Sequence, residues 1–480
     1  MRSLKPPPSI SAGWRWAGEV GAAGLAAAGV PGVGVAAAGV PGVGVAAGSR
    51  ETGSAAGSDD SEGPQARSEV RTAKDNRRRM KRELAQRSGR DKLGPMNEEP
   101  PALLSTTSEV ELLVEHLLDE PRYALDTEFL RERTYYAKLA LVQIAWPGGV
   151  ALIDPLATAA EALKPLLEGK GLAVIHAASQ DLEILAQDCG AVPSRVFDTQ
   201  IAAAFVGLGR PSLAKLTQEL LDVSLSKAEQ LADWTRRPLS PAALRYAAAD
   251  VTHLLPLHDA LSARLETLER DAFCGAECEE QRTASLAERP DEQAWWRIKG
   301  SRSMSRRSQG VAQEVAAWRV SRARQQDKPL KWVLSDMALL GVIQRAPKNL
   351  GALRKIRGFE GRALHDDAAQ SLLEAVRRGE ELSDDAVCRP PERDGHKPSE
   401  THVALAMAWL TERARQISIE PSVLATRSDV EEFVASRAGR LAHGHRHRVI
   451  GVELDKLLDG RLALTCDPDG GLKQVELSAS

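Results

Sequence analysis

The pattern of apolar and polar positions becomes regular at about Thr106 and predicts helices and strands from there onward. Residues 108–118 place Leu and Val at helical spacing behind a Ser-Glu start, which predicts a capped amphipathic helix. Three apolar, β-favouring runs follow, and a Pro-Gly-Gly turn separates the last two. These runs predict strands at 123–129, 139–145 and 150–153.

The next part of the chain alternates between short apolar runs and helical spacing. It predicts a helix at about 159–168, a strand at 172–177, a helix at 180–187, a short strand at 196–197 and mostly helical sequence to about 268. Asp198 stands where the next helix begins, so we expect it to cap that helix. A strand meander followed by alternating strands and helices predicts an α/β domain, with a mixed sheet flanked by helices.

Apolar residues recur at helical spacing through the rest of the chain. Residues 295–379 predict a small all-α bundle, in which we expect the Trp295-Trp296 pair to anchor the core and not to stack on bases. Residues 380–399, rich in Pro, Asp and Glu, predict a linker, and 402–464 predict a second, more divergent bundle. We therefore expect folded domains at 96–290, 295–380 and 400–480.

The first 95 residues lack the pattern of a packed core. The sequence Ala-Ala-Ala-Gly-Val-Pro-Gly-Val-Gly-Val occurs at 26–35 and again at 36–45. Such Gly/Pro repeats cannot build a core, so 1–95 is predicted to be a disordered low-complexity tail. Met96 stands where the folded pattern begins. If translation starts at Met96, the start of the printed sequence is assigned too far upstream and residues 1–95 are not part of the protein.

The amino-acid composition indicates where in the cell the protein is expected to work. The 480 residues are 43% hydrophobic, yet no uninterrupted apolar run is long enough to span a bilayer. The 5 cysteines are an odd, sparse set without the spacing of a disulfide framework or a zinc site. We therefore expect a cytoplasmic protein with no membrane partner, and no obligate protein partner is evident.

Charge is unevenly distributed along the chain. The formal net charge is -3, but 295–379 holds 18 Lys and Arg against 7 Asp and Glu. A basic module in an otherwise acidic protein indicates a nucleic-acid contact surface. A solvated helical module that is merely rich in arginine is the alternative.

The first candidate chemistry lies in the predicted strand 123–129. Asp126 and Glu128 are two residues apart, so on a strand their side chains point to the same face. Two like charges that close repel unless a cation lies between them, and oxygen ligands suit Mg²⁺ or Mn²⁺. A strand with an acidic solvent face would show the same spacing, so further carboxylates must decide.

Further carboxylates stand at two later positions. Asp181 falls in the first turn of a helix, just past the end of a predicted strand, where α/β sheets place functional side chains. Tyr246 and Asp250 stand at i and i+4 of a predicted helix and share one of its faces. Each is weak alone, because an acid in a first turn is usually a dipole or cap residue. Four acids and one tyrosine in this order are a far more specific signal of a functional site than any one of them alone.

This order resembles the tyrosine subclass of the DEDD 3′→5′ exonucleases. The related histidine subclass has a histidine five residues before the last aspartate, and here that position is Arg245. Two small departures, Ala137 for a family Pro and Gln180 for the usual Glu, touch no ligand position. The matching stretches are Leu-Asp-Thr-Glu-Phe-Leu-Arg-Glu-Arg-Thr-Tyr-Tyr (125–136), Ala-Leu-Ile-Asp-Pro-Leu (151–156), 176–182, 197–201, Asp233-Trp234, Arg237-Pro238-Leu239 and 246–251.

The resemblance implies a ribonuclease H-like fold and hydrolysis at an RNA 3′ end. It implies two divalent ions, Mg²⁺ or Mn²⁺, and a tyrosine, Tyr246, that orients the attacking water. The products would be nucleoside 5′-monophosphates, and the expected substrates are tRNA precursors with 3′ extensions. The metal ligands implied are Asp126, Glu128, Asp181 and Asp250.

The helical region resembles a second family. Residues 295–379 are similar to the helicase-and-ribonuclease-D C-terminal domain, HRDC, and 400–480 resemble a divergent second copy.

Two other classes of function stay open. One is a DNA-directed 3′→5′ repair or proofreading exonuclease with the same site, since nothing in the sequence reads a 2′-hydroxyl unambiguously. The other is a non-catalytic RNA-binding scaffold, which would be expected to lack one of the acids.

Overall fold

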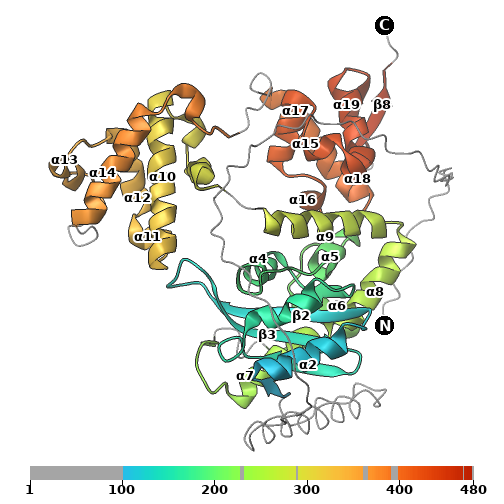
Figure 1. The fold of residues 1–480 in the computed structure, drawn as a ribbon. Coiled ribbons are helices and arrows are strands. Elements are labelled where there is room, and N and C mark those ends of the chain that lie inside the picture. The colour runs from blue at the N-terminus through green and yellow to red at the C-terminus, as the bar shows by residue number, and fades with distance from the viewer. Residues whose placement is uncertain are drawn as a thin grey trace, which may run out of the picture. The chain divides into compact units, whose positions relative to one another are not determined.

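The computed structural model describes residues 101–226, 232–287, 290–359, 366–390, 398–468 and 470–477 (Figure 1). The tail predicted at 1–95 lies outside these residues. Among the described helices, none combines the length and the apolar character needed to cross a membrane.

A six-stranded mixed sheet forms the centre of the exonuclease-like part of the chain, as the strand pattern predicted. Its order is β1-β4-β3-β2-β5-β6, in which β3 pairs antiparallel with β2 and β4 and the other pairs are parallel. The two-residue β1 was not predicted, and its parallel pairing with β4 defines it. The strands are β1 (Leu103–Leu104), β2 (Arg122–Leu130), β3 (Lys138–Trp146), β4 (Gly149–Ile153), β5 (Leu172–Ile175) and β6 (Val196–Asp198).

Helices cover both faces of this sheet (Figure 1). On one face, α2 (Thr107–Leu117), α3 (Lys164–Leu167) and α4 (Ser179–Asp188) pack on alternate residues of the strands, including Leu125 and Ile144. On the other face lie α7 (Pro241–Thr252) and α8 (Leu254–Thr267), against residues such as Leu141 and Ala145. The remaining elements are η1 (Ala160–Leu163), α5 (Thr199–Phe205), α6 (Leu213–Leu221) and α9 (Asp271–Leu286).

The predicted helix starts are made by side-chain caps. The Thr106 hydroxyl accepts a hydrogen bond from the Glu109 N–H at 3.3 Å, and the Glu109 carboxylate accepts one from the Thr106 N–H at 3.1 Å, so a capping box begins α2. Asp198 caps α5, as predicted, by accepting from the N–H groups of Gln200 and Ile201 at 2.8 and 3.3 Å.

Residues 290–390 form an all-helical unit, called here the first bundle. Helices α10 and α14 cross so closely at Gly310 and Gly379 that a Cβ on Gly310 would lie 2.4 Å from the Gly379 carbonyl oxygen. Only glycine at both positions permits this approach. The elements are η2 (Asp291–Arg297), η3 (Ser301–Ser303), α10 (Arg306–Gln326), α11 (Leu330–Val333), α12 (Asp336–Arg345), α13 (Leu350–Arg354), α14 (Asp366–Glu381) and η4 (Asp384–Ala386).

The tryptophan pair anchors the first bundle, as expected. Trp295 is fully buried, and the indole N–H groups of Trp295 and Trp296 both donate to the carbonyl oxygen of Cys388, at 3.0 and 2.9 Å. Cys388 belongs to the segment that its composition predicted to be a linker. The first part of that segment instead folds back onto the bundle, because it satisfies two indole N–H groups and buries Val387.

Residues 398–477 form a further unit, called here the C-terminal module. Its apolar residues, among them Trp409 and Phe433, belong to one continuous core with Phe205 of α5 and Leu257 of α8. A two-stranded hairpin ends the module and was not predicted. The elements are α15 (Glu400–Gln416), α16 (Pro421–Leu424), α17 (Arg427–Ser436), η5 (Arg440–Ala442), α18 (Gly444–Arg446), the π-helical η6 (His447–Gly451), α19 (Val452–Leu458), β7 (Leu462–Cys466) and β8 (Leu472–Glu476).

Candidate active site

The site begins on the central strand β2. Asp126 and Glu128 are both half-buried and point to the face of the sheet that α7 covers. Their partners across the antiparallel pair are Gln143 and Leu141 of β3. The ladder shifts register directly after Glu128, between it and Phe129. Both acids therefore lie on the regularly paired part of β2, and the regular pairing of β2 with β3 ends just after them.

Asp181 comes to the site from the first turn of α4. It is buried, and the hydroxyl of Thr127, which lies between the two strand acids, donates to its Oδ1 at 2.5 Å. The turn before α4 is fixed by a residue of another element, since the N–H groups of Ala177 and Ala178 donate to the carboxylate of Asp198 in β6 at 3.0 and 2.9 Å. Thus the cap of α5 also fixes the start of α4.

Tyr246 and Asp250 lie one turn apart on α7, which begins at Pro241 behind the cap made by Ser240. The helix packs on β2, β3 and β4 through Ala243 and Ala247, whose small side chains allow close approach. Both side chains are half-buried. The i,i+4 pair predicted from the sequence is therefore on the side of α7 that meets the acidic strand.

A second layer supports Tyr246. The Trp234 ring lies 6.1 Å from the Tyr246 ring, measured between centroids. The segment that carries Trp234 is tied to β4 by Arg237, which donates from Nε and Nη2 to the two oxygens of Asp154, both at 2.6 Å. Asp154 is buried, so this pair is a fixed brace and not a surface contact.

Burial, and for Asp126 and Glu128 also the charges of other acids among the four, raises the pKa of each of the four carboxyl groups. Burial raises the pKa of Asp126 well above its usual range, and the negative charges of the other three acids raise it further. Burial raises the pKa of Glu128 to about 8, with added repulsion from Asp250 and Asp181. Burial raises the pKa of Asp250 to about 7 and that of Asp181 to about 6. The structure thus brings together the residues that the sequence singled out, in an environment that disfavours four uncompensated anions.

Carboxylates in this setting fit a hard cation by their chemistry. Their oxygen-only donor set suits Mg²⁺ or Mn²⁺, and a bound cation would offset the repulsion among the acids. In the part of the chain that the structure describes, no three His, Cys, Asp or Glu side chains already stand in the arrangement of a formed metal site.

His176, directly after β5, has a local partner. Its Nδ1 lies 2.9 Å from the hydroxyl of Thr199, and burial lowers the pKa of the ring. The imidazole belongs to the junction of β5 and α5.

Comparison with known proteins identifies the family. A family model described as 3′-5′ exonuclease matches residues 101–266, and one described as HRDC domain matches 308–376. The chain is 35% identical over 379 residues to ribonuclease D of Gluconacetobacter diazotrophicus, covering 76% of this chain and 95% of the relative. It is 36% identical over 377 residues to ribonuclease D of Jannaschia sp., covering 76% and 97%. The chain belongs to the ribonuclease D family.

A solved structure agrees with this assignment. The chain matches Escherichia coli RNase D, described as an exoribonuclease involved in structured RNA processing, with a TM-score of 0.69 and 29% identity, over 75% of this chain and 99% of that one. As a ribonuclease D, the protein is a 3′→5′ exoribonuclease, a hydrolase with a ribonuclease H-like domain followed by an HRDC domain. The HRDC match ends at residue 376, so the second copy at 400–480 stays a prediction.

Sequence reasoning missed three residues that adjoin the candidate site. Thr127 stands between two acids and reads as an ordinary strand residue, but its hydroxyl contacts Asp181. Gln143 faces Asp126 across the β2–β3 pair, which only the strand register reveals. Asp154 lies within a stretch that matched the family, and its pairing with Arg237 could not be read from either position alone.

Proposed function

We propose that this protein trims the 3′ ends of RNA, tRNA precursors in particular, by hydrolysis with two divalent metal ions, and releases nucleoside 5′-monophosphates in the cytoplasm. The observation that carries the proposal is the set of four carboxyl groups from β2, α4 and α7, in which Asp126 feels the charge of the other three and which lies beside one tyrosine hydroxyl. Bound Mg²⁺ or Mn²⁺ would supply an activated water and stabilise the departing 3′-oxygen.

The residues divide this work between them. Asp126, Glu128, Asp181 and Asp250 would hold the ions, and the negative charges of the other three acids act on Asp126. Burial and the neighbouring acids raise the pKa of Tyr246 to about 12, so its hydroxyl keeps its proton at neutral pH. A protonated hydroxyl orients the attacking water by a hydrogen bond and does not act as the base.

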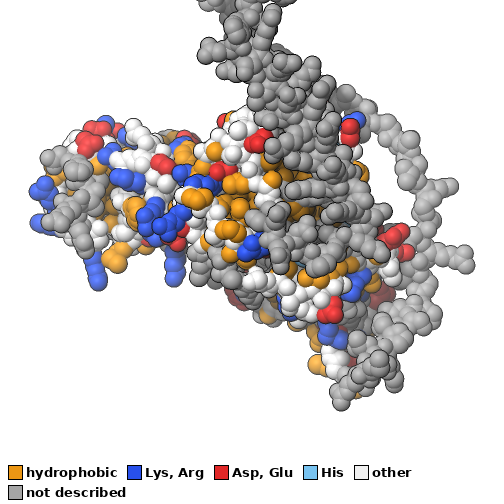
Figure 2. All heavy atoms as spheres, turned by 90° about the horizontal axis from the view of Figure 1, so that it is seen from below, with side chains coloured by type: hydrophobic (Ala, Val, Ile, Leu, Met, Phe, Trp, Pro, Cys, Tyr) orange, Lys and Arg blue, Asp and Glu red, His pale blue; other side chains and the backbone are white. Residues whose placement is uncertain are grey.

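The first bundle would hold the body of the RNA. Residues 295–379 carry 18 Lys and Arg against 7 Asp and Glu, and Figure 2 shows Lys and Arg side chains standing out over this part of the surface, at the left of the view. Contacts from these groups to phosphates bind RNA independently of its sequence. The basic surface therefore supports an RNA substrate longer than the few nucleotides that enter the acidic site.

The test is a pair of end-labelled RNAs. With Mg²⁺, a 3′-labelled RNA should release its label at once as a mononucleotide, whereas a 5′-labelled copy should shorten one residue at a time. EDTA should stop both reactions, and added Mg²⁺ should restore them. Asp126→Asn should nearly abolish turnover, while Glu161→Gln, an exposed acid outside the site, should not.

Two outcomes would contradict the proposal. Full turnover in EDTA would exclude the metal mechanism, and equal or faster trimming of a matched DNA would favour the DNA-directed alternative. A tRNA precursor with a 3′ extension, compared with a mature tRNA, tests the substrate named here.

A further inference from the structure

Gln143 lies in the middle of β3, directly opposite Asp126 of β2. Its exposed fraction is 0%, and neither its side-chain nitrogen nor its side-chain oxygen has a hydrogen-bond partner among the described residues. Opposed residues of an antiparallel pair point to the same face, with Cβ atoms about 4.5–5.5 Å apart. The amide therefore shares the α7-covered face of the sheet with the first acid of the site.

The surroundings of Gln143 on that face are otherwise apolar. Leu141 and Ala145 precede and follow it on the same face of β3, and Leu152 faces it from β4. Ala247 of α7 belongs to the apolar cluster that packs over Leu141 and Leu152. A buried polar group without a hydrogen bond destabilises the folded protein, and buried polar groups in folded proteins nearly always have partners. A leucine or methionine would fit this position without that loss of stability. The presence of an amide therefore indicates a hydrogen-bond partner that becomes available when the metal ions are bound.

We propose that Gln143 is a positioning residue, whose side-chain N–H donates a hydrogen bond to one carboxylate oxygen of Asp126 when the site is loaded. Asp126 is the polar group directly opposite the amide, and its carboxylate is an acceptor when ionised. With one oxygen held from β3, the other is presented to the ion in a fixed direction. Outer hydrogen bonds of this kind orient metal-binding carboxylates. The inference rests on the proposed function, because it takes Asp126 to be a metal ligand.

Tyr123 provides a matched control on the same β2 strand. It is also fully buried, and its hydroxyl likewise finds no hydrogen-bond partner within the described ranges. It points to the opposite face, into the core formed with α2 and α4. Tyr123→Phe and Gln143→Met each remove an unpartnered buried polar group with little change in volume. Only the second removes a group that faces Asp126.

The experiment compares these variants in the full chain with Gln143→Asn, which keeps a shorter amide. Four quantities are measured: the melting temperature, the Mg²⁺ affinity by calorimetry without RNA, and kcat and KM on a short single-stranded RNA. We expect both Gln143→Met and Tyr123→Phe to keep or raise the melting temperature. Gln143→Met alone should weaken Mg²⁺ binding and lower kcat, each by about 10- to 100-fold, with KM for RNA unchanged. Gln143→Asn should fall between it and the wild type.

The opposite results are equally clear. If Gln143→Met binds Mg²⁺ and turns over RNA like Tyr123→Phe, the amide has no role toward Asp126. If it unfolds, or melts well below the wild type while the folded fraction keeps its kcat, the amide is structural. Either result overturns the inference. A wild-type protein that needs no divalent ion would instead overturn the proposed function, and the Mg²⁺ titration of the wild type separates that failure from the others.

Discussion

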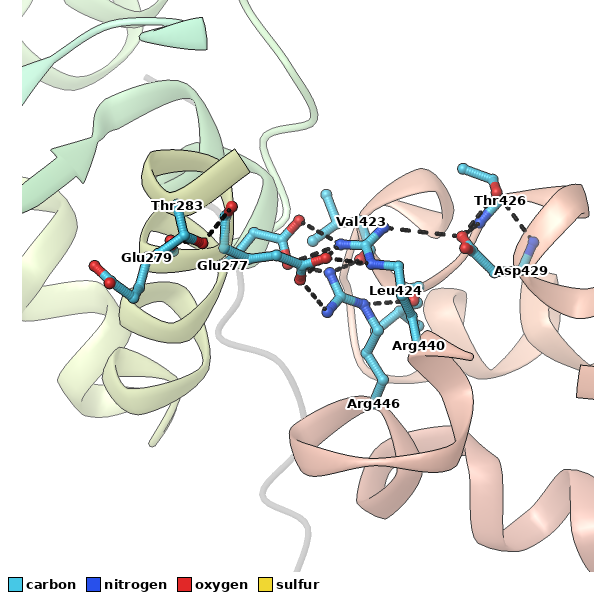
Figure 3. Close-up of polar contacts among 10 residues, drawn as sticks. Glu277, Glu279, Thr283, Val423, Leu424, Thr426, Asp429, Arg440 and Arg446 are labelled. Atoms are coloured by element: carbon cyan, nitrogen blue, oxygen red, sulfur yellow. Dashed lines mark hydrogen bonds and ion pairs between the residues drawn. The ribbon is translucent and has the colours of Figure 1, made fainter. Parts of the chain in front are cut away.

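Arg446 of α18 donates a hydrogen bond to the carboxylate of Glu277 in α9, 169 residues earlier in the chain (Figure 3). Both residues are buried. Arg446 also donates to Glu280 at 3.0 Å, and Arg440 donates to both glutamates, at 3.1 and 3.0 Å. The C-terminal module is therefore joined to α9 by buried charge as well as by the shared apolar core.

Glu277→Ala should strongly destabilise the protein. Removing one partner of a buried ion pair costs about 3–5 kcal/mol, and because Glu280 stays beside Arg446, the cost should lie near the lower end of that range. The double variant Glu277→Gln, Arg446→Met should recover part of the loss. The measurement is urea unfolding of the full chain. Arg427→Gln, which breaks the more exposed pairs with Glu431 and Glu400, should cost less than about 1 kcal/mol, and an equal cost for both sites would contradict this account.

A chain that ends at residue 390 should fold poorly. It keeps every predicted catalytic residue and the first bundle, but it uncovers apolar residues of α5, α8 and α9 that pack against the C-terminal module. It also strips Arg270 of the Ile417 carbonyl oxygen to which it donates. We expect aggregation, or a melting temperature at least about 10 °C lower. A truncated protein with the wild-type melting temperature would show that the module is an independent appendage.

Thr127→Val should impair catalysis more than stability. Valine keeps the shape of threonine but removes the hydroxyl that donates to Asp181 Oδ1 at 2.5 Å. A hydrogen bond to a charged group is worth about 1.5–3 kcal/mol, so kcat should fall by about tenfold or more. Thr127→Ser restores the donor and should restore most of the rate. The comparison is steady-state kinetics on one short RNA. Equal rates for the valine and serine variants would assign Thr127 to packing alone.

Neutralising the first bundle should change RNA binding and not the chemical step. Lys348, Lys355 and Arg357 are exposed there, and replacing all three by glutamine should weaken binding of a structured RNA. The plot of log Kd against log salt should also flatten, by about 0.9 for each duplex phosphate that the variant no longer neutralises. The kcat on a very short oligonucleotide should stay at the wild-type value. Lys164→Gln, in the exonuclease domain, is the control, and a reduced kcat on the short substrate would refute the division of labour.

The sequence was enough to predict features that depend on local patterns. Apolar runs with β-favouring residues gave β2 and β3 to within one residue at each end, and the spacing of Asp126 and Glu128 predicted their common face. The i,i+4 spacing of Tyr246 and Asp250 worked for the same reason, because both periodicities are properties of the backbone.

Features that depend on tertiary partners were not predictable. The two residues of β1 form a strand only because β4 lies beside them. The partner of Thr127 is on another element, and Gln143 is notable only once the register opposes it to Asp126. The segment around Cys388 was predicted to be a linker from its Pro and Asp content. The prediction failed there because composition does not reveal that two indole N–H groups donate to the Cys388 carbonyl oxygen.

Asp198 belongs to β6, yet its carboxylate holds the turn at Ala177 and Ala178 that starts α4. A growing polypeptide that has not yet reached β6 lacks the support for the turn that presents Asp181. One that has not reached α7 lacks Tyr246 and Asp250 altogether. The proposed site is therefore complete only after α7 has been synthesised and has packed onto β3.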